Sequence, residues 1–198
     1  MRSIHAVAIA GLISLGALSA SAQSTTRAAS WEFLASSGAL VPTGAQRNAV
    51  KDAALSIAQL SYVTPMNIAI TASAGWARSR DLATANRQRL SVFTYDVGAE
   101  WRGATWRPES RLGAMPFAGL GVGGRSYDHR GIDSDATHGV AGYAAGGVEV
   151  GAQRVRVRFE ARDYVSGFRP VGGAQSSVAR NDLMLLVGLQ LSRRAVTR

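Results

Sequence analysis

Polar and apolar residues alternate along residues 154–164 of the chain. The even-numbered positions hold polar side chains: Arg154, Arg156, Arg158, Glu160, Arg162 and Tyr164. The odd-numbered positions hold mainly apolar or small ones: Val155, Val157, Phe159 and Ala161. A period of two is typical of a β-strand, because successive side chains point to opposite faces of a sheet. This segment alone does not decide which face is buried.

The same period recurs along the rest of the chain. It predicts further strands over residues 31–36, 54–63, 68–78, 93–102, 116–125, 140–151 and 183–192, which makes eight with 154–164. No helical period follows the first 22 residues. A loop is expected around residues 42–48, and Thr64-Pro65-Met66-Asn67 predicts a tight turn. In segment 54–63 the apolar side chains switch from one face of the expected strand to the other near Ala58 and Gln59. This switch indicates either a β-bulge or a turn that we have assigned to the wrong residues.

The shortest predicted connection is a two-residue turn at Ala152-Gln153. Continuing an antiparallel register from this turn places Glu149 opposite Arg156, and Tyr143 opposite Arg162. By this count charged residues face charged residues across the two strands.

The first 22 residues are typical of a cleaved signal peptide. A short basic head precedes the apolar run Ala6 to Leu18, and Ala20-Ser21-Ala22 matches a small-residue cleavage site. We expect export with cleavage after Ala22, a short lead over residues 23–29, a barrel over 30–192 and a basic tail over 193–198. The sequence has no cysteine, so disulfides, thiolate metal sites and c-type haem attachment are excluded.

The composition of the two strand faces predicts which side is inside. The polar faces combine charged residues with glycines, namely Gly75, Gly98, Gly119, Gly121, Gly123, Gly147 and Gly188. Glycine beside large arginines makes sense where space is limited, as in the lumen of a narrow barrel. The opposite faces carry aromatic and aliphatic residues, and Trp31, Trp76 and Trp101 lie near strand ends. We therefore expect the apolar faces to contact lipid.

These features together resemble the small eight-stranded outer-membrane barrels of the OmpA/OmpX type. The resemblance rests on the leader, the eight amphipathic strands, the Arg/Glu-lined polar face and the apolar last strand. It implies an all-β, eight-stranded antiparallel up-and-down transmembrane β-barrel with a polar, Gly/Arg/Glu-lined interior. It also implies location in the outer membrane, insertion by the barrel-assembly machinery, and contact with outer-membrane lipids and lipopolysaccharide. Family members usually end the last strand on an aromatic residue, whereas this chain continues past Leu191 with a basic tail.

Charged residues on the polar faces predict an ion-pair network that closes the lumen. The candidate residues are Glu32, Asp96, Glu100, Arg102, Arg125, Glu149, Arg154, Arg156, Arg158, Glu160 and Arg162. An unpaired buried charge is costly, so these side chains need partners of opposite sign. The alternative is a narrow porin-like channel in which arginines attract anions. Eight strands leave room mainly for side chains, which favours the network.

Two outer loops carry further candidate chemistry. Arg78, Arg80, Arg87 and Arg89 flank one loop, and guanidinium groups there are suited to lipopolysaccharide phosphates, although a solvated charged loop has the same composition. Another loop gathers Asp128, His129, Asp133, Asp135 and His138. These residue types can hold a divalent cation, but an exposed turn explains them more simply, and we expect no metal.

The functional prediction is a non-enzymatic outer-membrane barrel that anchors loops for surface interaction. We expect no cofactor, and no nucleic-acid partner, since the leader indicates export and many arginines share one strand face. A lipid-directed hydrolase using His129 or His138 is an alternative, but the sequence has no G-x-S-x-G elbow. Another is a soluble lipocalin-like ligand-binding barrel, in which the apolar faces would turn inward.

Overall fold

A single closed sheet contains most of the residues that the structure describes. The computed structural model describes residues 28–43, 47, 50–80, 82, 89–106, 112–129, 137–152, 154–168 and 178–194, so the predicted signal peptide lies outside the described residues. The strands are β1 (Ser30–Thr43), β2 (Ala53–Val63), β3 (Ile68–Arg80), β4 (Arg89–Arg102), β5 (Gly113–His129), β6 (Thr137–Ala152), β7 (Val155–Phe168) and β8 (Val178–Arg194). Among the described residues, no helix is long and apolar enough to cross a membrane.

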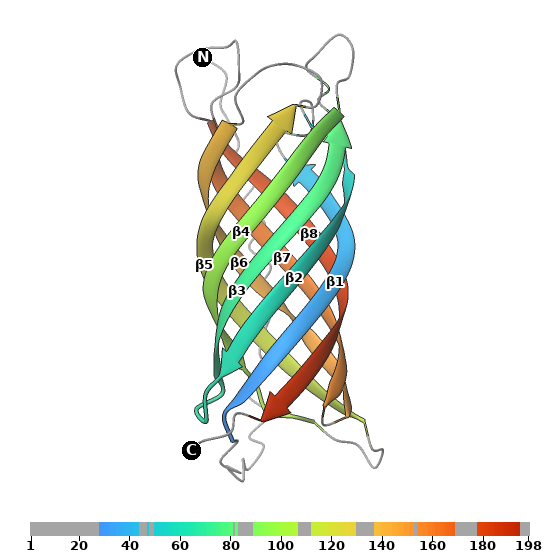
Figure 1. The fold of residues 1–198 in the computed structure, drawn as a ribbon, viewed down its shortest axis with the longest axis vertical. Coiled ribbons are helices and arrows are strands. Elements are labelled where there is room, and N and C mark those ends of the chain that lie inside the picture. Colours follow the sequence, from blue (N-terminus) through green and yellow to red (C-terminus); the bar gives the residue numbers. More distant parts are fainter. Residues whose placement is uncertain are drawn as a thin grey trace, which may run out of the picture.

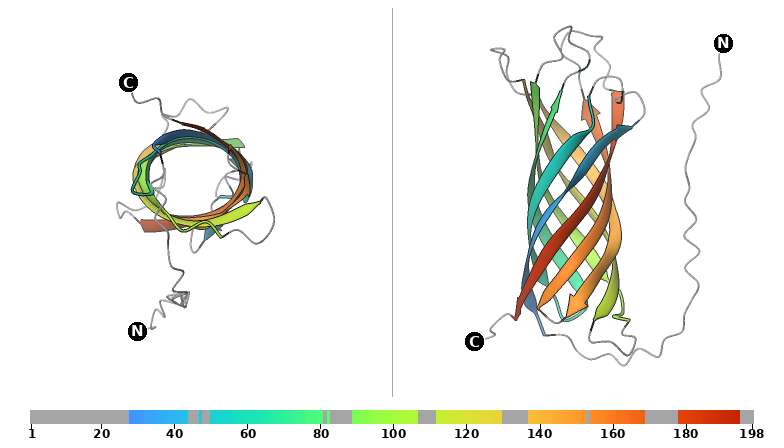
Figure 2. Two further views of the ribbon diagram at one scale, coloured as in Figure 1. Left: turned by 90° about the horizontal axis from the view of Figure 1, so that it is seen from below. Right: turned by 90° about the vertical axis from the view of Figure 1, so that its right-hand side faces the viewer.

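The strands form an up-and-down barrel. Each strand pairs antiparallel with its neighbours in the sequence, and β8 returns to pair with β1. The strands are strongly tilted, and the barrel is a closed ring when seen along its axis (Figures 1 and 2). The predicted eight-stranded antiparallel barrel is therefore confirmed.

Most strands are longer than the sequence pattern predicted, and the differences in β1 and β8 change the assignment of specific residues. β1 runs to Thr43, so Pro42 lies in a strand and not in a loop. Pairing of β1 with β2 stops at Leu40, whereas Pro42 still lies opposite Asp182 of β8. Proline is tolerated there because only one side of the strand has a partner. β8 extends to Arg194, which pairs with Ser30.

The bulge considered for β2 does not exist. Burial alternates along the whole of β2, and its register with both neighbouring strands is continuous. Leu55, Ile57, Gln59 and Ser61 all point inward. The inward-facing residues of β2 change from apolar to polar because the barrel interior itself changes from apolar to polar along this strand.

The tight turn between β2 and β3 is confirmed. The Thr64 amide donates to the Ile68 carbonyl at 2.8 Å, and the Asn67 amide donates to the Thr64 carbonyl at 3.1 Å. Pro65 presets its own φ angle, and Asn67 adopts a positive φ of 61°, which asparagine tolerates better than most residues. Local turn chemistry therefore sets this connection.

The predicted register between β6 and β7 is wrong by two residues. The hairpin closes on the pair Ala152 and Val155 and not on the predicted pair Gly151 and Arg154, so Glu149 lies opposite Arg158. Moving a hairpin turn by one residue moves the register by two. Because the side-chain period is also two, each residue stays on its predicted face.

The outer surface of the barrel is apolar. Large exposed side chains include Phe33, Leu60, Ile70, Tyr95, Val97, Leu120, Val122, Phe159, Val187 and Leu189. Aromatic residues mark the two ends: Trp31 packs against Tyr62 at 5.1 Å between ring centroids, and Trp76 against Phe93 at 6.5 Å. This arrangement is the opposite of what a soluble lipocalin-like barrel requires, and it fits a surface in contact with lipid.

The interior leaves little space beside its glycines, and this generates a first prediction. A methyl group at Gly123 would overlap the Tyr95 carbonyl oxygen and Oδ1 of Asp96. At Gly142 in β6 the nearest atom would be 3.8 Å away. We expect Gly123→Ala to lower the free energy of unfolding by about 1–3 kcal/mol, as overpacking does, and Gly142→Ala to change it little. Urea unfolding in lipid vesicles measures both, and equal stabilities would contradict the packing described.

Candidate functional site in the barrel interior

The inner face of the barrel gathers nearly all of the predicted charged residues. Glu32, Asp96, Glu100, Arg102, Arg125, Glu149, Arg158, Glu160 and Arg162 are buried, and Arg156 is partly buried. They come from β1, β4, β5, β6 and β7, at positions of inward parity. Strands distant in sequence therefore meet inside the barrel.

Arg158 of β7 lies at the centre of this group. Its Nη2 donates to Oε1 of Glu100 at 2.7 Å, and its Nη1 donates to Oε2 of the same carboxylate at 3.1 Å. Nη1 also lies 3.0 Å from Glu149, and Nε lies 2.8 Å from Glu160. The guanidinium carbon lies 3.6 Å from the centre of the Phe117 ring. Arg158 thus contacts three carboxylates and one aromatic face, which uses the planar fork that distinguishes arginine from lysine.

Arg102 of β4 joins the carboxylates of three strands. Its Nη2 lies 3.0 Å from Glu100 and 3.2 Å from Glu32, and its Nη1 pairs with Glu149. Glu32 is in β1, the strand that pairs with β8 to close the barrel, so Arg102 links the network to this strand.

Gln190 of β8 and Arg156 of β7 complete the contacts of these carboxylates. The Gln190 amide donates to Glu32 at 3.0 Å and to Glu149 at 3.1 Å. Arg156 Nη1 donates to Glu149 at 3.3 Å. Glu149 consequently has four donors around it: Arg102, Arg156, Arg158 and Gln190.

A second cluster surrounds Arg162. Its Nε pairs with Glu160, so Glu160 links Arg158 to Arg162 along the same strand. Its Nη2 donates to the side-chain oxygen of Gln59 in β2, and Gln59 donates in turn to Glu100 at 3.2 Å. The two clusters are therefore one connected network.

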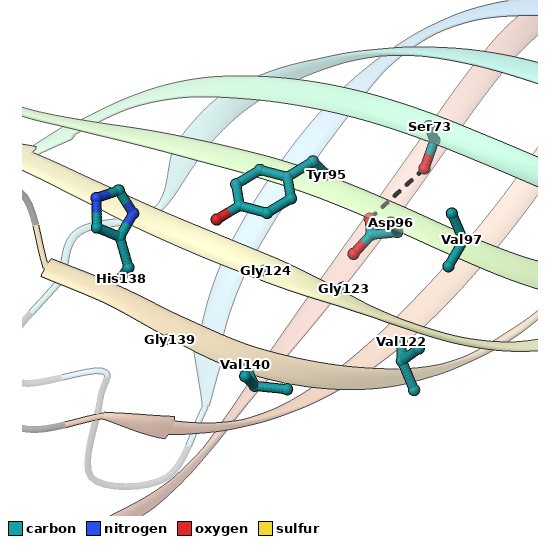
Figure 3. Close-up of a pocket in the computed structure, with 10 residues that line it drawn as sticks. All are labelled: Ser73, Tyr95, Asp96, Val97, Val122, Gly123, Gly124, His138, Gly139 and Val140. Atoms are coloured by element: carbon teal, nitrogen blue, oxygen red, sulfur yellow. Dashed lines mark hydrogen bonds between the residues drawn. The ribbon is translucent and has the colours of Figure 1, made fainter.

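Asp96 and Tyr164 extend the polar contacts toward the opposite end of the barrel. The Tyr164 hydroxyl donates to Oδ2 of Asp96 at 2.7 Å, and Ser73 donates to the same oxygen at 3.5 Å (Figure 3). Arg125 lies over the Tyr164 ring at 4.2 Å and pairs with Asp182 of β8. Asp182 is a partner that the sequence analysis did not include.

The half of the interior farther from the β2–β3 and β6–β7 turns also contains an apolar cluster, which was not predicted. Its members include Leu40, Leu55, Ile57, Leu90, Val92, Tyr127, Tyr143, Met184 and Leu186, each at most 6% exposed. Side chains thus pack the lumen there by the hydrophobic effect, while ion pairs pack the rest.

The inward charges of the described residues nearly cancel. Six carboxylates (Glu32, Asp96, Glu100, Glu149, Glu160 and Asp182) face five guanidiniums (Arg102, Arg125, Arg156, Arg158 and Arg162), which leaves a formal interior charge of −1. The basic excess of the whole chain is therefore not located in the lumen.

Arg154 does not belong to the interior, contrary to the sequence prediction. It lies in the turn between β6 and β7 with an exposed side chain. The cause is the turn position described above, which ends the inward-facing row of β7 at Arg156.

The loop candidates are only partly within the described residues. Arg78, Arg80 and Arg89 are exposed at the ends of β3 and β4, whereas Arg87 lies outside the described residues. Asp133, Asp135 and the side chain of His129 also lie outside them, Asp128 is half-buried in β5, and His138 is exposed. Within the described part of the chain, no group of three or more His, Asp or Glu side chains is placed to hold a metal ion.

A shallow hollow of about 460 Å³ lies in the barrel wall over β4, β5 and β6 (Figure 3). Gly123, Gly124 and Gly139 contribute no side chains to the wall, while Tyr95 and His138 lie at its edge. The glycines make the wall thin and bring the outer surface close to Asp96. The aliphatic edge residues Val97, Val122 and Val140 show that this hollow opens to the apolar exterior.

Some interior residues were not predicted, although the alternation along their strands places them on the inner face. Asp182 has the same parity as Met184 and Gln190, and Phe117 has the parity of Gly119 and Arg125. Extending each alternation by one residue beyond the predicted strand would have found Asp182. Gln59 was obscured by the change from apolar to polar residues along β2.

The central position of Arg158 generates a second prediction. Arg158→Met would leave Glu100, Glu149 and Glu160 short of positive charge in a buried setting. We expect the free energy of unfolding to fall by about 3–5 kcal/mol, because removing one partner leaves uncompensated buried charge. Arg154→Met, which removes an exposed arginine, should change it by less than about 0.5 kcal/mol. Urea unfolding of both variants measures the difference, and equal effects would contradict the network.

Comparisons with known proteins agree with this architecture. The sequence matches no protein-family model and no curated protein. Among solved structures, it is similar to Neisserial surface protein A (NspA), with a TM-score of 0.56 and 13% identity over 83% of this chain and 99% of that chain. The N-terminal β-barrel domain of Pseudomonas aeruginosa OprF has a TM-score of 0.53 and 11% identity over 83% of this chain and 97% of that chain.

The outer membrane protein AlkL is a third similar structure, with a TM-score of 0.51 and 13% identity over 86% of this chain and 92% of that chain. Identities this low show a shared fold and not a shared activity. The chain has the fold of the small eight-stranded outer-membrane barrels.

Proposed function

We propose that this protein is a structural barrel of the outer membrane, with a closed lumen and with loops that supply any surface recognition. The observation that carries the proposal is the reversed arrangement of its two faces. Large apolar side chains cover the outside, and a connected set of ion pairs fills the inside. Such an arrangement is stable in lipid and would be unfavourable in water.

The lumen supports an anchor better than a channel. Arg102, Arg158 and Arg162 are each at most 1% exposed and each contacts at least one carboxylate. An anion channel needs arginines whose charge is available to a passing ion. Here the guanidiniums are occupied by the protein's own carboxylates, and the apolar cluster packs the lumen further along the axis.

A catalytic role has little support in the described residues. His138 is exposed at the edge of the wall hollow in Figure 3, and no described hydroxyl forms a hydrogen bond with it. A hydrolytic nucleophile needs a base within hydrogen-bond reach. We therefore propose a non-enzymatic protein.

The proposed partners follow from the location. The barrel would be inserted by the barrel-assembly machinery, and its outer face would contact outer-membrane lipids and lipopolysaccharide. Longer connections are typically extracellular in this architecture, and shorter turns periplasmic. The connections after β1, β3, β5 and β7 span seven to nine residues each, whereas those after β2 and β6 span four and two, so the end with these two turns would face the periplasm. The ten-residue connection after β4 is the exception at that end.

Cell fractionation and gel electrophoresis test the location and the closed barrel. We expect recovery of the protein in the outer membrane and a band that migrates faster without boiling than after boiling, because a closed barrel resists detergent at low temperature. A soluble protein without a heat-dependent shift would contradict the proposal.

Planar-bilayer recording tests the closed lumen separately. We expect no stable single-channel conductance from the wild-type protein, since ion pairs and apolar side chains occupy the interior. Protein-free bilayers treated with the same detergent provide the control. Reproducible conductance steps would contradict the closed lumen while leaving the membrane location intact.

A further inference from the structure

Three arginines lie close together on the outer face of β3 and β4, at the end of the barrel opposite the β2–β3 and β6–β7 turns. Arg80 lies directly opposite Arg89 in the sheet, and Arg78 is two residues from Arg80 on the same face. All three are exposed. Like charges directly opposite one another in a sheet are destabilising, so a contact with a negative charge would stabilise this arrangement.

The described part of the chain does not supply that compensation. None of these three rim arginines forms an ion pair with a described residue. Lys51 adds another positive charge nearby, because its amide donates to the Arg80 carbonyl at 3.1 Å. Asp52, the adjacent acidic residue, is exposed and forms no ion pair with a described residue either. The patch is complementary to an external anion.

A groove of about 880 Å³ lies on the lipid-facing surface beside this patch. Its floor consists of small residues on three adjacent strands: Ala35 and Ser37 of β1, Ser56 and Ala58 of β2, and Ala74 of β3. Trp76 and Phe93 form one wall, and Val187 and Leu189 form the other. A surface of this shape is suited to hydrocarbon chains.

Trp76 connects the rim arginines to the groove. Its indole forms part of the groove wall, and the Arg78 guanidinium lies 4.3 Å from the centre of its ring. A molecule with a phosphate at the arginines would therefore have its attached chains directed past Trp76 into the groove. Neither a free phosphate nor an uncharged lipid would use both features.

We propose that the rim arginines and the groove form a binding site for a phosphate-bearing, multiply acylated lipid of the outer leaflet, the lipid A part of lipopolysaccharide. Arg78, Arg80 and Arg89 would bind the phosphate by charge-assisted hydrogen bonds, and the small-residue floor would receive acyl chains. This inference rests on the proposed function, because it requires the end opposite the β2–β3 and β6–β7 turns to face the outer leaflet.

Tryptophan fluorescence tests the site on the full chain in a non-ionic detergent. Replacing Trp31, Trp101 and Trp106 by Phe leaves Trp76 as the reporter, since the sequence has four tryptophans. We expect a saturable change with diphosphoryl lipid A. Dephosphorylated lipid A should bind at least about tenfold more weakly, since each arginine near an anionic lipid contributes roughly a fivefold factor. An equal response to inorganic phosphate alone would overturn the lipid site.

Two pairs of variants separate the contribution of the phosphate contact to lipid A binding from the contribution of the groove. The triple variant R78Q/R80Q/R89Q should weaken lipid A binding by about 100-fold. The control R154Q/R193Q/R194Q removes the same charge from exposed positions at the opposite end of the barrel and should leave binding unchanged. Ala58→Phe should weaken binding by filling the groove, whereas Ala99→Phe, on the lipid-facing side of β4 outside the groove, should not.

The outcomes distinguish failure of the site from failure of the proposed function. Equal weakening by the two triple variants would overturn the site in favour of general charge attraction. A wild-type band with a heat-dependent shift but no response to lipid A would overturn the site alone. A wild-type chain without that shift would overturn the outer-membrane proposal, and the site with it.

Discussion

The structure depends on giving each charge that the barrel encloses an ion-pair or hydrogen-bond partner. Lipid would surround the apolar exterior, and eight strands leave interior room mainly for side chains, so an unpaired inward charge cannot be compensated by bulk water. Arg158 meets this constraint by contacting Glu100, Glu149 and Glu160, which come from three strands. Such contacts fix the positions of these strands relative to one another along the barrel axis. The network therefore specifies register as well as neutralising charge.

Glycine makes these contacts possible. Tyr143 lies against Gly98 and Gly121, where an added methyl group would overlap its ring or hydroxyl. Asp96 likewise lies against the backbone at Gly123. Glycine weakens strand propensity, so its repeated use on the inner face needs a compensating gain. That gain is the space for large polar side chains, and strand propensity, side-chain packing and electrostatics are thus satisfied by the same residue pattern.

The alternation of residue types was sufficient to predict the barrel, its faces and most of its interior. It could not predict the register of β6 and β7, because any even shift keeps Glu149 and Arg158 on the inner face. It misplaced Arg154 for a related reason, since a turn residue next to an alternating strand continues the pattern. The β2 bulge was an error of another kind: it assumed a uniform interior, whereas Leu55 and Gln59 point into different environments.

The distribution of charge explains why a strongly basic chain need not be an anion channel. The sequence has 22 basic and 13 acidic side chains, of which five and six respectively face the described interior. This leaves 17 basic and seven acidic side chains for the rest of the sequence. The interior is thus nearly neutral, and its arginines are counterions to buried carboxylates. The positive excess lies elsewhere in the chain, and at the outer ends of β3 and β4 it is placed where phosphates of a membrane surface would be in reach.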